Sequence, residues 1–216
     1  MTKRNTFDRQ TRRGFLAGVS AAGVVGLAGC NVIGGSEDVP TADPNAETLP
    51  TPIRGDPEAD VTVMAFEDYV CGHCASFVLE ELSQLETEYI ESGTIRYEHH
   101  DFPLPLSDES WRAPNAARAV QDTVGEEAYW EFSHKLYENQ SDLGLSLYES
   151  LAEEVGANPE TVRTAAVEEE YEATILADRE HGEGLGVEAT PTVFVNGSAV
   201  ADYRFSTIEQ AIEDEL

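Results

Sequence analysis

Cys71-Gly72-His73-Cys74 follows an apolar, strand-like segment at residues 61–66 and begins an amphipathic helix predicted over residues 71–92. A sulfur at the start of a helix lies beside unpaired backbone N–H groups and the partial positive charge of the helix, and both stabilise a thiolate. Cys74, one turn further on, can close a disulfide with Cys71. This stretch therefore predicts a cysteine pair that exchanges disulfides with the thiols of other proteins.

Two further strand patterns flank a long helical region. Residues 94–100 alternate like a strand, and because they follow a crossover helix we expect them to pair in parallel with residues 61–66. Residues 192–195 are β-branched and aromatic, and Asn196-Gly197 after them is a strong hairpin signal. Between these strands, helices are predicted near residues 108–124, 126–140, 146–156 and 159–182. The predicted order is βαβ, a helical insertion, a β-hairpin and a final helix, an α/β arrangement.

This order of elements and four local motifs resemble the DsbA-like family of thioredoxin-fold proteins. The motifs are Phe66-Glu67-Asp68-Tyr69-Val70-Cys71-Gly72-His73-Cys74, Asp101-Phe102-Pro103-Leu104, Tyr129-Trp130-Glu131-Phe132 and the segment from Gly186 to Gly197. They cover residues 57–216 in the family's order. The resemblance implies a thioredoxin fold (βαβ, then ββα) with a helical insertion at about residues 107–186. It also implies a thiol–disulfide oxidoreductase with no cofactor beyond its cysteines.

The resemblance assigns roles to single residues as well. It implies that Thr190-Pro191 is a cis peptide that faces the cysteines and guides an extended substrate segment. Cys71 is expected to be the more exposed sulfur, which a substrate thiolate attacks when the pair is oxidised; if the reduced pair acts instead, Cys71 attacks and Cys74 resolves. His73 is expected to help stabilise the Cys71 thiolate. Helix-end charge and His73 both favour an oxidising pair, so we expect a dithiol oxidase. A disulfide isomerase or a reductase is the alternative, because Gly-His between the cysteines is like that of protein disulfide isomerase.

One position departs from the pattern that the resemblance implies. Six residues before the first active-site cysteine, the thioredoxin superfamily often has a buried acid that helps to move the proton of the second cysteine. Here that position is Ala65. Glu67 and Asp68 are close in sequence, but we expect them to point differently. The proton would then pass to water, to His73 or to one of these carboxylates, and the sequence leaves that choice open.

The first thirty residues are typical of an export signal. Arg12-Arg13 precedes a weakly apolar, Gly-rich stretch, the twin-arginine pattern, and Leu27-Ala28-Gly29-Cys30 resembles a lipobox. We therefore expect a signal peptide at residues 1–29, a lipid on Cys30 and a flexible tether over residues 30–56. The domain would then be anchored at the outer face of the cell membrane. An uncleaved helical anchor with an idle Cys30 is the alternative.

The charge of the chain limits its partners. The formal net charge is −29, and residues 1–29 contain five cations and one acid, so the rest of the chain is more acidic than this total suggests. Such a surface strongly disfavours nucleic acid as a partner. Lys135 is the only lysine after the first thirty residues, a composition that resembles proteins of extreme halophiles, so we expect a haloarchaeal type. The expected partners are cysteine-containing exported proteins and a redox partner that recycles the cysteine pair.

Two other classes of function remain open from the sequence. The cysteine pair with His99 or His100 could form a soft Cu(I) site, as in some thioredoxin-fold copper chaperones, although a solvated strand end is favoured for these histidines. We expect no metal site. The second class is a non-enzymatic module with a structural Cys71–Cys74 disulfide, but so small a loop would stabilise the fold little.

Overall fold

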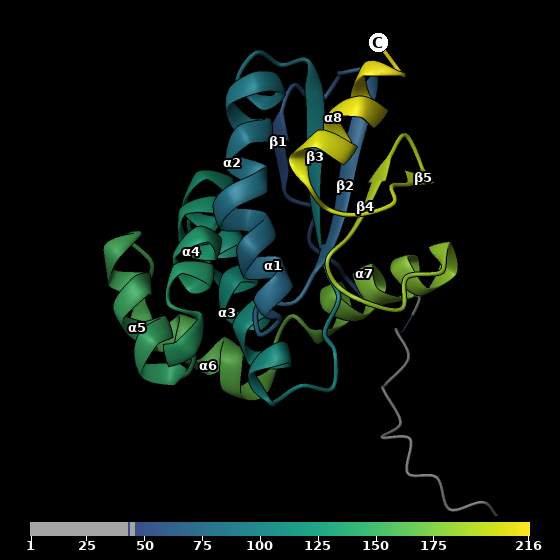
Figure 1. Ribbon diagram of the computed structural model, residues 1–216. Coiled ribbons are helices and arrows are strands. Elements are labelled where there is room, and N and C mark those ends of the chain that lie inside the picture. Colours follow the sequence, from purple (N-terminus) through teal and green to yellow (C-terminus); the bar gives the residue numbers. More distant parts are fainter. Residues whose placement is uncertain (1–42, 44–45) are drawn as a thin grey trace, which may run out of the picture. The chain divides into compact units, whose positions relative to one another are not determined.

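A five-stranded mixed sheet forms the centre of the described part of the chain, in the computed structural model of Asp43 and residues 46–216. The predicted signal peptide and Cys30 lie outside these residues. The strands are β1 (Ile53–Gly55), β2 (Val61–Glu67), β3 (Ile95–Asp101), β4 (Thr192–Val195) and β5 (Ser198–Ala199). Their order is β1-β3-β2-β4-β5 (Figure 1). β2 and β3 are parallel and the other neighbours antiparallel, so the predicted βαβ unit and hairpin are confirmed.

The crossover from β2 to β3 is the helix that begins after Cys71. It runs as α1 (Gly72–Ser76), a π-helical segment (Phe77–Glu81), α2 (Leu82–Leu85) and a second π-helical segment (Glu86–Ile90). Four apolar residues spaced along one face of this helix are buried, namely Val78, Leu82, Leu85 and Tyr89. This amphipathic face fixes the direction of the helix and hence the position of the cysteines at its first turn.

Alternate residues of β2 face two different cores, because strand side chains point to opposite faces in turn. Val63 and Ala65 pack in the main core, which also contains residues of α2 and of α8 (Phe205–Glu213). Phe66 points the other way, into a smaller cluster with Phe102 and Phe194. In Figure 1, α2 and α8 cover the same face of the sheet. The cysteine helix therefore lies over the face that carries Ala65.

The helical insertion lies between β3 and β4. It consists of α3 (Glu109–Thr123), α4 (Glu126–Glu138), α5 (Leu145–Glu154), α6 (Pro159–Glu168) and α7 (Glu172–Leu185), with a 3₁₀ turn at Gln140–Asp142. The prediction of one helix over residues 159–182 is wrong. The helix is interrupted at Glu169, whose φ of 53° lies in the left-handed region. Neither glycine nor proline marks this break in the sequence, so the pattern gave no signal for it.

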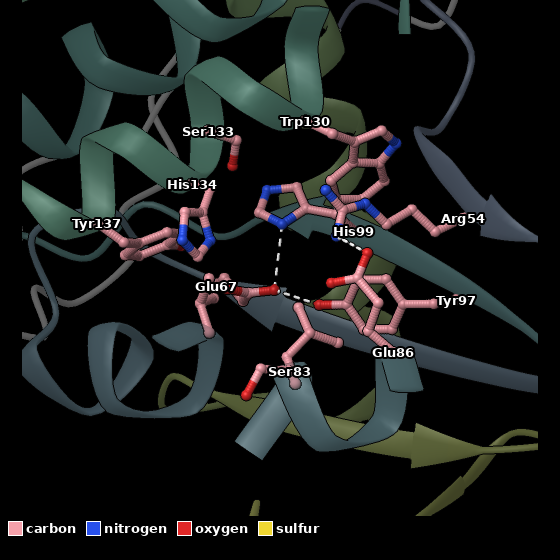
Figure 2. A pocket seen from close by; sticks show the side chains of 12 residues that line it. Arg54, Glu67, Ser83, Glu86, Tyr97, His99, Trp130, Ser133, His134 and Tyr137 are labelled. Atoms are coloured by element: carbon pink, nitrogen blue, oxygen red, sulfur yellow. Dashed lines mark hydrogen bonds and ion pairs between the residues drawn. The ribbon is translucent and has the colours of Figure 1, made fainter. Parts of the chain in front are cut away.

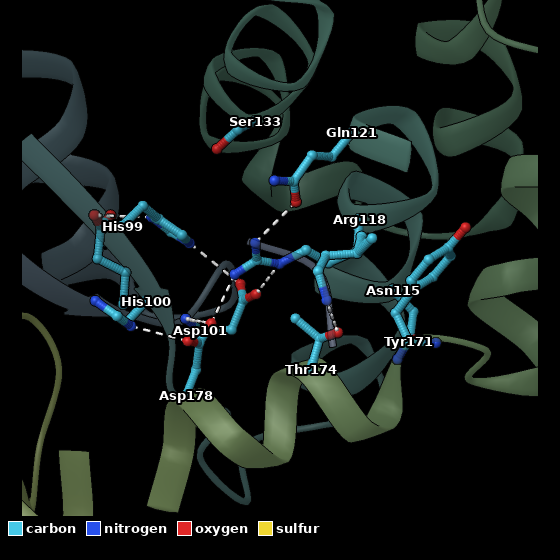
Figure 3. A network of polar contacts seen from close by, with 12 residues as sticks. His99, His100, Asp101, Asn115, Arg118, Gln121, Ser133, Tyr171, Thr174 and Asp178 are labelled. Atoms are coloured by element: carbon cyan, nitrogen blue, oxygen red, sulfur yellow. Dashed lines mark hydrogen bonds and ion pairs between the residues drawn. The ribbon is translucent and has the colours of Figure 1, made fainter. Parts of the chain in front are cut away.

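A buried network of charges joins the insertion to the sheet. Arg118 of α3 donates to Asp101 of β3 at 2.7 Å and to Asp178 of α7 at 2.6 Å (Figure 3). Nδ1 of His100 lies 2.9 Å from Asp178, and Nε2 of His99 lies 3.2 Å from Asp101. Burial alone would raise the pKa of Asp101, but Arg118 and His99 hold it below its usual value. Each charge has a partner, so the network holds α3 and α7 against β3.

The prediction of a flexible tether over residues 30–56 is wrong at its C-terminal end. Ile53–Gly55 forms β1, antiparallel to β3 at the edge of the sheet. Just before it, the Pro50 carbonyl accepts a hydrogen bond from Gln121 at 2.9 Å. A three-residue edge strand is too short to show a periodic pattern, so composition alone assigned it to the tether. Within the described residues, no helix combines the length and the apolar character needed to cross a membrane.

Candidate active site

Cys71 lies immediately before the first turn of α1. Its backbone is extended (φ −74°, ψ 119°), and its carbonyl accepts hydrogen bonds from the N–H groups of Cys74 at 3.0 Å and Ala75 at 3.2 Å. Gln140, from the helical insertion, donates to the carbonyls of Tyr69 and Cys71 at 2.8 and 2.9 Å. The insertion thus helps to hold the cysteine loop in place, a contact that the sequence did not indicate.

The Cys71 sulfur is strongly stabilised as a thiolate. Its pKa is lowered to about 5, chiefly because the Cys74 thiol donates a hydrogen bond to it. Burial opposes this shift, whereas the backbone N–H groups of Cys74 and His73 add to it. Near neutral pH the reduced pair therefore carries a negative charge on Cys71.

Cys74 has the opposite character. It is fully buried, and its sulfur accepts a hydrogen bond from the backbone N–H of Asp68 at 3.4 Å. Burial, the hydrogen bond to Cys71 and the nearby Glu67 carboxylate, in that order, raise its pKa well above the ordinary value. Both cysteines are reduced in this structure, so the pair consists of one thiolate and one buried thiol.

Thr190, the residue before Pro191, contacts Cys71, although the two are 119 positions apart in the chain. The Cys71 sulfur lies 3.3 Å from the carbonyl oxygen of Thr190. The Thr190–Pro191 peptide bond is cis, so the state that the resemblance implied is confirmed. The geometry leaves an extended segment beside the more exposed of the two sulfurs.

The His73 side chain is directed toward a residue that the sequence did not single out. Its Nδ1 lies 3.0 Å from the hydroxyl of Tyr203, in the loop before α8, and the two ring centroids are 6.0 Å apart. His73 acts on the Cys71 pKa through its backbone N–H. The contact with Tyr203 ties the residue between the cysteines to the C-terminal part of the fold.

Glu67 lies on the same face of β2 as Ala65, so the expectation that it points differently is wrong. Residues two apart on a strand share a face, and this spacing was a signal that the sequence contained. One oxygen, Oε1, accepts a hydrogen bond from the Tyr97 hydroxyl at 2.6 Å and lies 3.1 Å from His99 Nδ1 (Figure 2). Ala65 thus stands where the superfamily often has a buried acid, and a buried acid, Glu67, follows two residues later, near Cys74.

His99 and His100 are both engaged elsewhere than at the sulfurs. The two ring nitrogens of His99 contact Glu67 and Asp101. His100 is on the opposite face of the sheet, where its ring stacks on Phe66 with the centroids 5.0 Å apart. In Asp43 and residues 46–216, no group of three or more His, Cys, Asp or Glu side chains could hold a metal ion. The copper alternative therefore has no support from the described residues.

The thiolate and the buried thiol follow the end of β2, and the Thr190–Pro191 segment precedes β4 beside it. This arrangement can exchange disulfides. Fold and site together assign the chain to the thiol–disulfide oxidoreductases of the thioredoxin fold. The chain belongs to the thioredoxin family, whose model, described as Thioredoxin, matches residues 47–214. This match begins inside the predicted tether, in agreement with the position of β1.

Known relatives share the fold over most of the chain. Disulfide bond formation protein D of Bacillus subtilis (strain 168) is 25% identical over 174 residues, which cover 76% of this chain and 77% of that protein. The crystal structure of oxidised BdbD from Bacillus subtilis has a TM-score of 0.72 at 25% identity, covering 76% of this chain and 92% of that one. Chlamydia trachomatis DsbA, at 21% identity and a TM-score of 0.68 over 82% and 96%, shows the same fold. The predicted DsbA-like fold with its helical insertion is confirmed.

Proposed function

We propose that this enzyme is a dithiol oxidase, which introduces disulfides into exported proteins by giving up its own Cys71–Cys74 disulfide. The observation that carries this proposal is the lowering of the Cys71 pKa to about 5. A stabilised thiolate stabilises the reduced pair, so the oxidised pair passes its disulfide on readily. The likeness to proteins named for disulfide bond formation supports the same direction.

The chemistry proceeds in two exchanges. A substrate thiolate attacks the Cys71 sulfur of the oxidised pair, which breaks the Cys71–Cys74 bond and leaves Cys74 to take up a proton. A second substrate thiolate then attacks the substrate sulfur of the mixed disulfide, and Cys71 departs as a thiolate. The substrate gains a disulfide and two electrons remain on the pair, which a recycling redox partner must remove. A low pKa makes Cys71 a good leaving group in the second exchange.

Equilibration with glutathione tests the direction of the reaction. Because the reduced pair is stabilised, the reduction potential is expected to lie well above the value of about −270 mV that is typical of thioredoxin. A potential at or below that value would support a reductase. Efficient rearrangement of a scrambled disulfide substrate, with slow net oxidation of a reduced one, would support an isomerase.

The location of the enzyme is a separate part of the proposal. The twin-arginine and lipobox patterns at residues 1–30 support export of the folded domain and attachment of a lipid to Cys30, at the outer face of the cell membrane. Cys30→Ser is expected to release the protein from the membrane fraction and to remove the mass of the lipid. If the variant stays in the membrane with an unshifted mass, attachment at Cys30 is wrong. The acidic composition supports assays in concentrated salt.

A further inference from the structure

The start of α1, beside the reactive sulfur, has few constraints of its own. A helix usually begins with a capping side chain, or with a proline at its first position that fixes φ at about −65°. Here Cys71 precedes α1, no side-chain hydrogen bond among the described residues caps the helix, and its first residue is Gly72. Glycine has the greatest conformational freedom of all residues. The backbone around Cys71 therefore depends on contacts from outside α1.

Gln140 supplies such a contact from the helical insertion. Its Nε2 donates one hydrogen bond to the carbonyl of Tyr69 at 2.8 Å and another to the carbonyl of Cys71 at 2.9 Å. Both partners can only accept, so this orientation of the amide is the one that gives two hydrogen bonds. The amide oxygen, Oε1, lies 4.0 Å from the point where Gly72 would carry a Cβ. One side chain thus spans the backbone from Tyr69 to Gly72.

Both Gln140 and one of its two acceptors are fixed to the helical insertion. Gln140 begins the 3₁₀ turn Gln140–Asp142, which follows α4 directly. The hydroxyl of Tyr69 lies 2.9 Å from Oγ of Ser133 in α4, and its ring stacks on Tyr137 of the same helix with the centroids 4.8 Å apart. The hydrogen bond from Gln140 therefore ties the backbone of Cys71 to α4.

The position of this backbone matters for the sulfur. A side chain just before a helix reaches the N–H groups of the second and third helical residues, which here are His73 and Cys74. The hydrogen bond from the Cys74 thiol is the largest cause of the lowered pKa of Cys71, and these two N–H groups lower it further. A backbone free to rotate at Cys71 and Gly72 would turn the sulfur away from them for part of the time.

We propose that Gln140 is a positioning residue of the exchange site, which keeps the Cys71 sulfur against the N–H groups at the start of α1 by holding the Cys71 carbonyl. The proposal rests on the function proposed above in one respect, that the Cys71 thiolate is the reactive group. Gln140 acts in place of the proline or the capping side chain that α1 lacks. The helical insertion thereby contributes to the reactivity of a cysteine that lies outside it.

Two measurements on Gln140→Ala test this role together: the pKa of Cys71, from the absorbance of its thiolate, and the equilibrium with glutathione. The variant lacks both hydrogen bonds, and we expect this pKa to rise by about 0.5–1 pH unit. Since only the thiolate is stabilised, the equilibrium constant for reduction at pH 7 should fall about threefold to tenfold, and well below pH 5 it should not change. A purely structural role would lower the free energy of unfolding without this dependence on pH.

Two further variants of the same turn complete the comparison. Gln140→Glu keeps the length of the side chain but replaces the two N–H donors by a carboxylate oxygen, which repels the carbonyls and the thiolate, so its effect should be at least as large. Ser141→Ala is the matched control, because the Ser141 hydroxyl lies 3.4 Å from Asp142 within the turn. It should leave the equilibrium constant within about twofold of wild type. If Gln140→Ala does not fold by circular dichroism, Gln140→Glu decides the question.

A proline at the first helical position provides an independent test. Cys71 is extended, as the residue before a proline prefers to be, and Gly72 is helical, as proline at that position requires. Gly72→Pro should therefore fix the start of α1 without help from Gln140. In the Gly72→Pro background, Gln140→Ala should change the equilibrium constant by less than about twofold, whatever Gly72→Pro does alone.

The outcomes distinguish this proposal from the function on which it rests. The role of Gln140 would be overturned, and the oxidase proposal left standing, by an unchanged equilibrium constant in the folded Gln140 variants, by a change that persists well below pH 5, or by an undiminished effect in the Gly72→Pro background. A wild-type potential as low as that of thioredoxin would instead overturn the oxidase proposal. The threefold to tenfold effect of Gln140→Ala would even then support its positioning role.

Discussion

The proton content of the reduced cysteine pair is expected to change near pH 5. Below that pH both sulfurs are thiols, and reduction of the disulfide takes up two electrons and two protons. Above it Cys71 is a thiolate while Cys74 keeps its proton, so reduction takes up only one. The reduction potential should therefore fall by about 59 mV per pH unit below pH 5 and by about 30 mV per unit from there toward pH 8.

The size of the effect at pH 7 follows from the same shift. At pH 7 an ordinary thiol is still protonated, whereas Cys71 has been deprotonated since about pH 5. These two pH units stabilise the reduced pair by about 3 kcal/mol relative to a pair with an ordinary thiol. Allowing for solvent screening at this partly open sulfur leaves roughly half of that. The pair should thus be about 30–60 mV more oxidising than one with an ordinary thiol. This advantage grows toward alkaline pH and disappears below pH 5.

The assay is equilibration with glutathione buffers at several pH values in concentrated salt, followed by alkylation of the remaining thiols. Absorbance of the Cys71 thiolate in the reduced enzyme, with Cys74→Ala as a reference that lacks the hydrogen bond from Cys74, gives the pKa directly. A single slope of about 59 mV per unit between pH 5 and pH 8 would refute the reasoning.

Three further predictions concern stability. Arg118→Met leaves the buried Asp101 without its strongest partner and should lower the free energy of unfolding in urea by about 3–5 kcal/mol; a loss below about 1 kcal/mol would show that the network matters little. Burial lowers the pKa of His99, but its two carboxylate neighbours outweigh burial and raise this pKa to about 9. The contribution of charged His99 to the free energy of unfolding should therefore be fully present below about pH 6.5 and should fall by about 3 kcal/mol by pH 9. Urea unfolding of the oxidised enzyme, in which neither cysteine titrates, checks this, and a flat profile would contradict it. Gly182→Ala would place a Cβ 2.9 Å from two phenylalanine rings and should lower the free energy of unfolding by about 1–3 kcal/mol. The control is Gly184→Ala in the same helix, whose Cβ would meet nothing within 4 Å and which should be neutral or slightly stabilising. Equal effects of the two variants in thermal unfolding would rule out the clash.

Much of the fold was predictable because its elements have strong local patterns. β2, the cysteine helix and the Asn196-Gly197 hairpin each follow from periodicity or turn chemistry within a few residues. β1 escaped prediction because it is only three residues long and owes its place to pairing with β3. The turn at Glu169 escaped because its left-handed conformation is adopted by a residue type that seldom takes it.

The site divides in the same way. Cys71 and Cys74 lie only three positions apart in the sequence, whereas Pro191 was placed beside them by a family resemblance and not by any local pattern. Gln140 and Tyr203 could not be predicted, because their contacts with the cysteine loop depend on how distant segments dock. The position of Glu67 could have been predicted, because strand alternation places residues 65 and 67 on one face. Its partners on β3 could not, because their contacts depend on how the strands pair.

Direct capture of the exchange intermediate tests the assignment of the cysteine pair most sharply. Cys74→Ala leaves Cys71 without a resolving partner, so mixing the reduced variant with a disulfide-containing peptide should yield a stable mixed disulfide. Peptide mapping by mass spectrometry is expected to find the adduct on Cys71, and Cys71→Ser should form none at its buried Cys74. Failure to trap an adduct on Cys71, or trapping on Cys74 alone, would contradict the account.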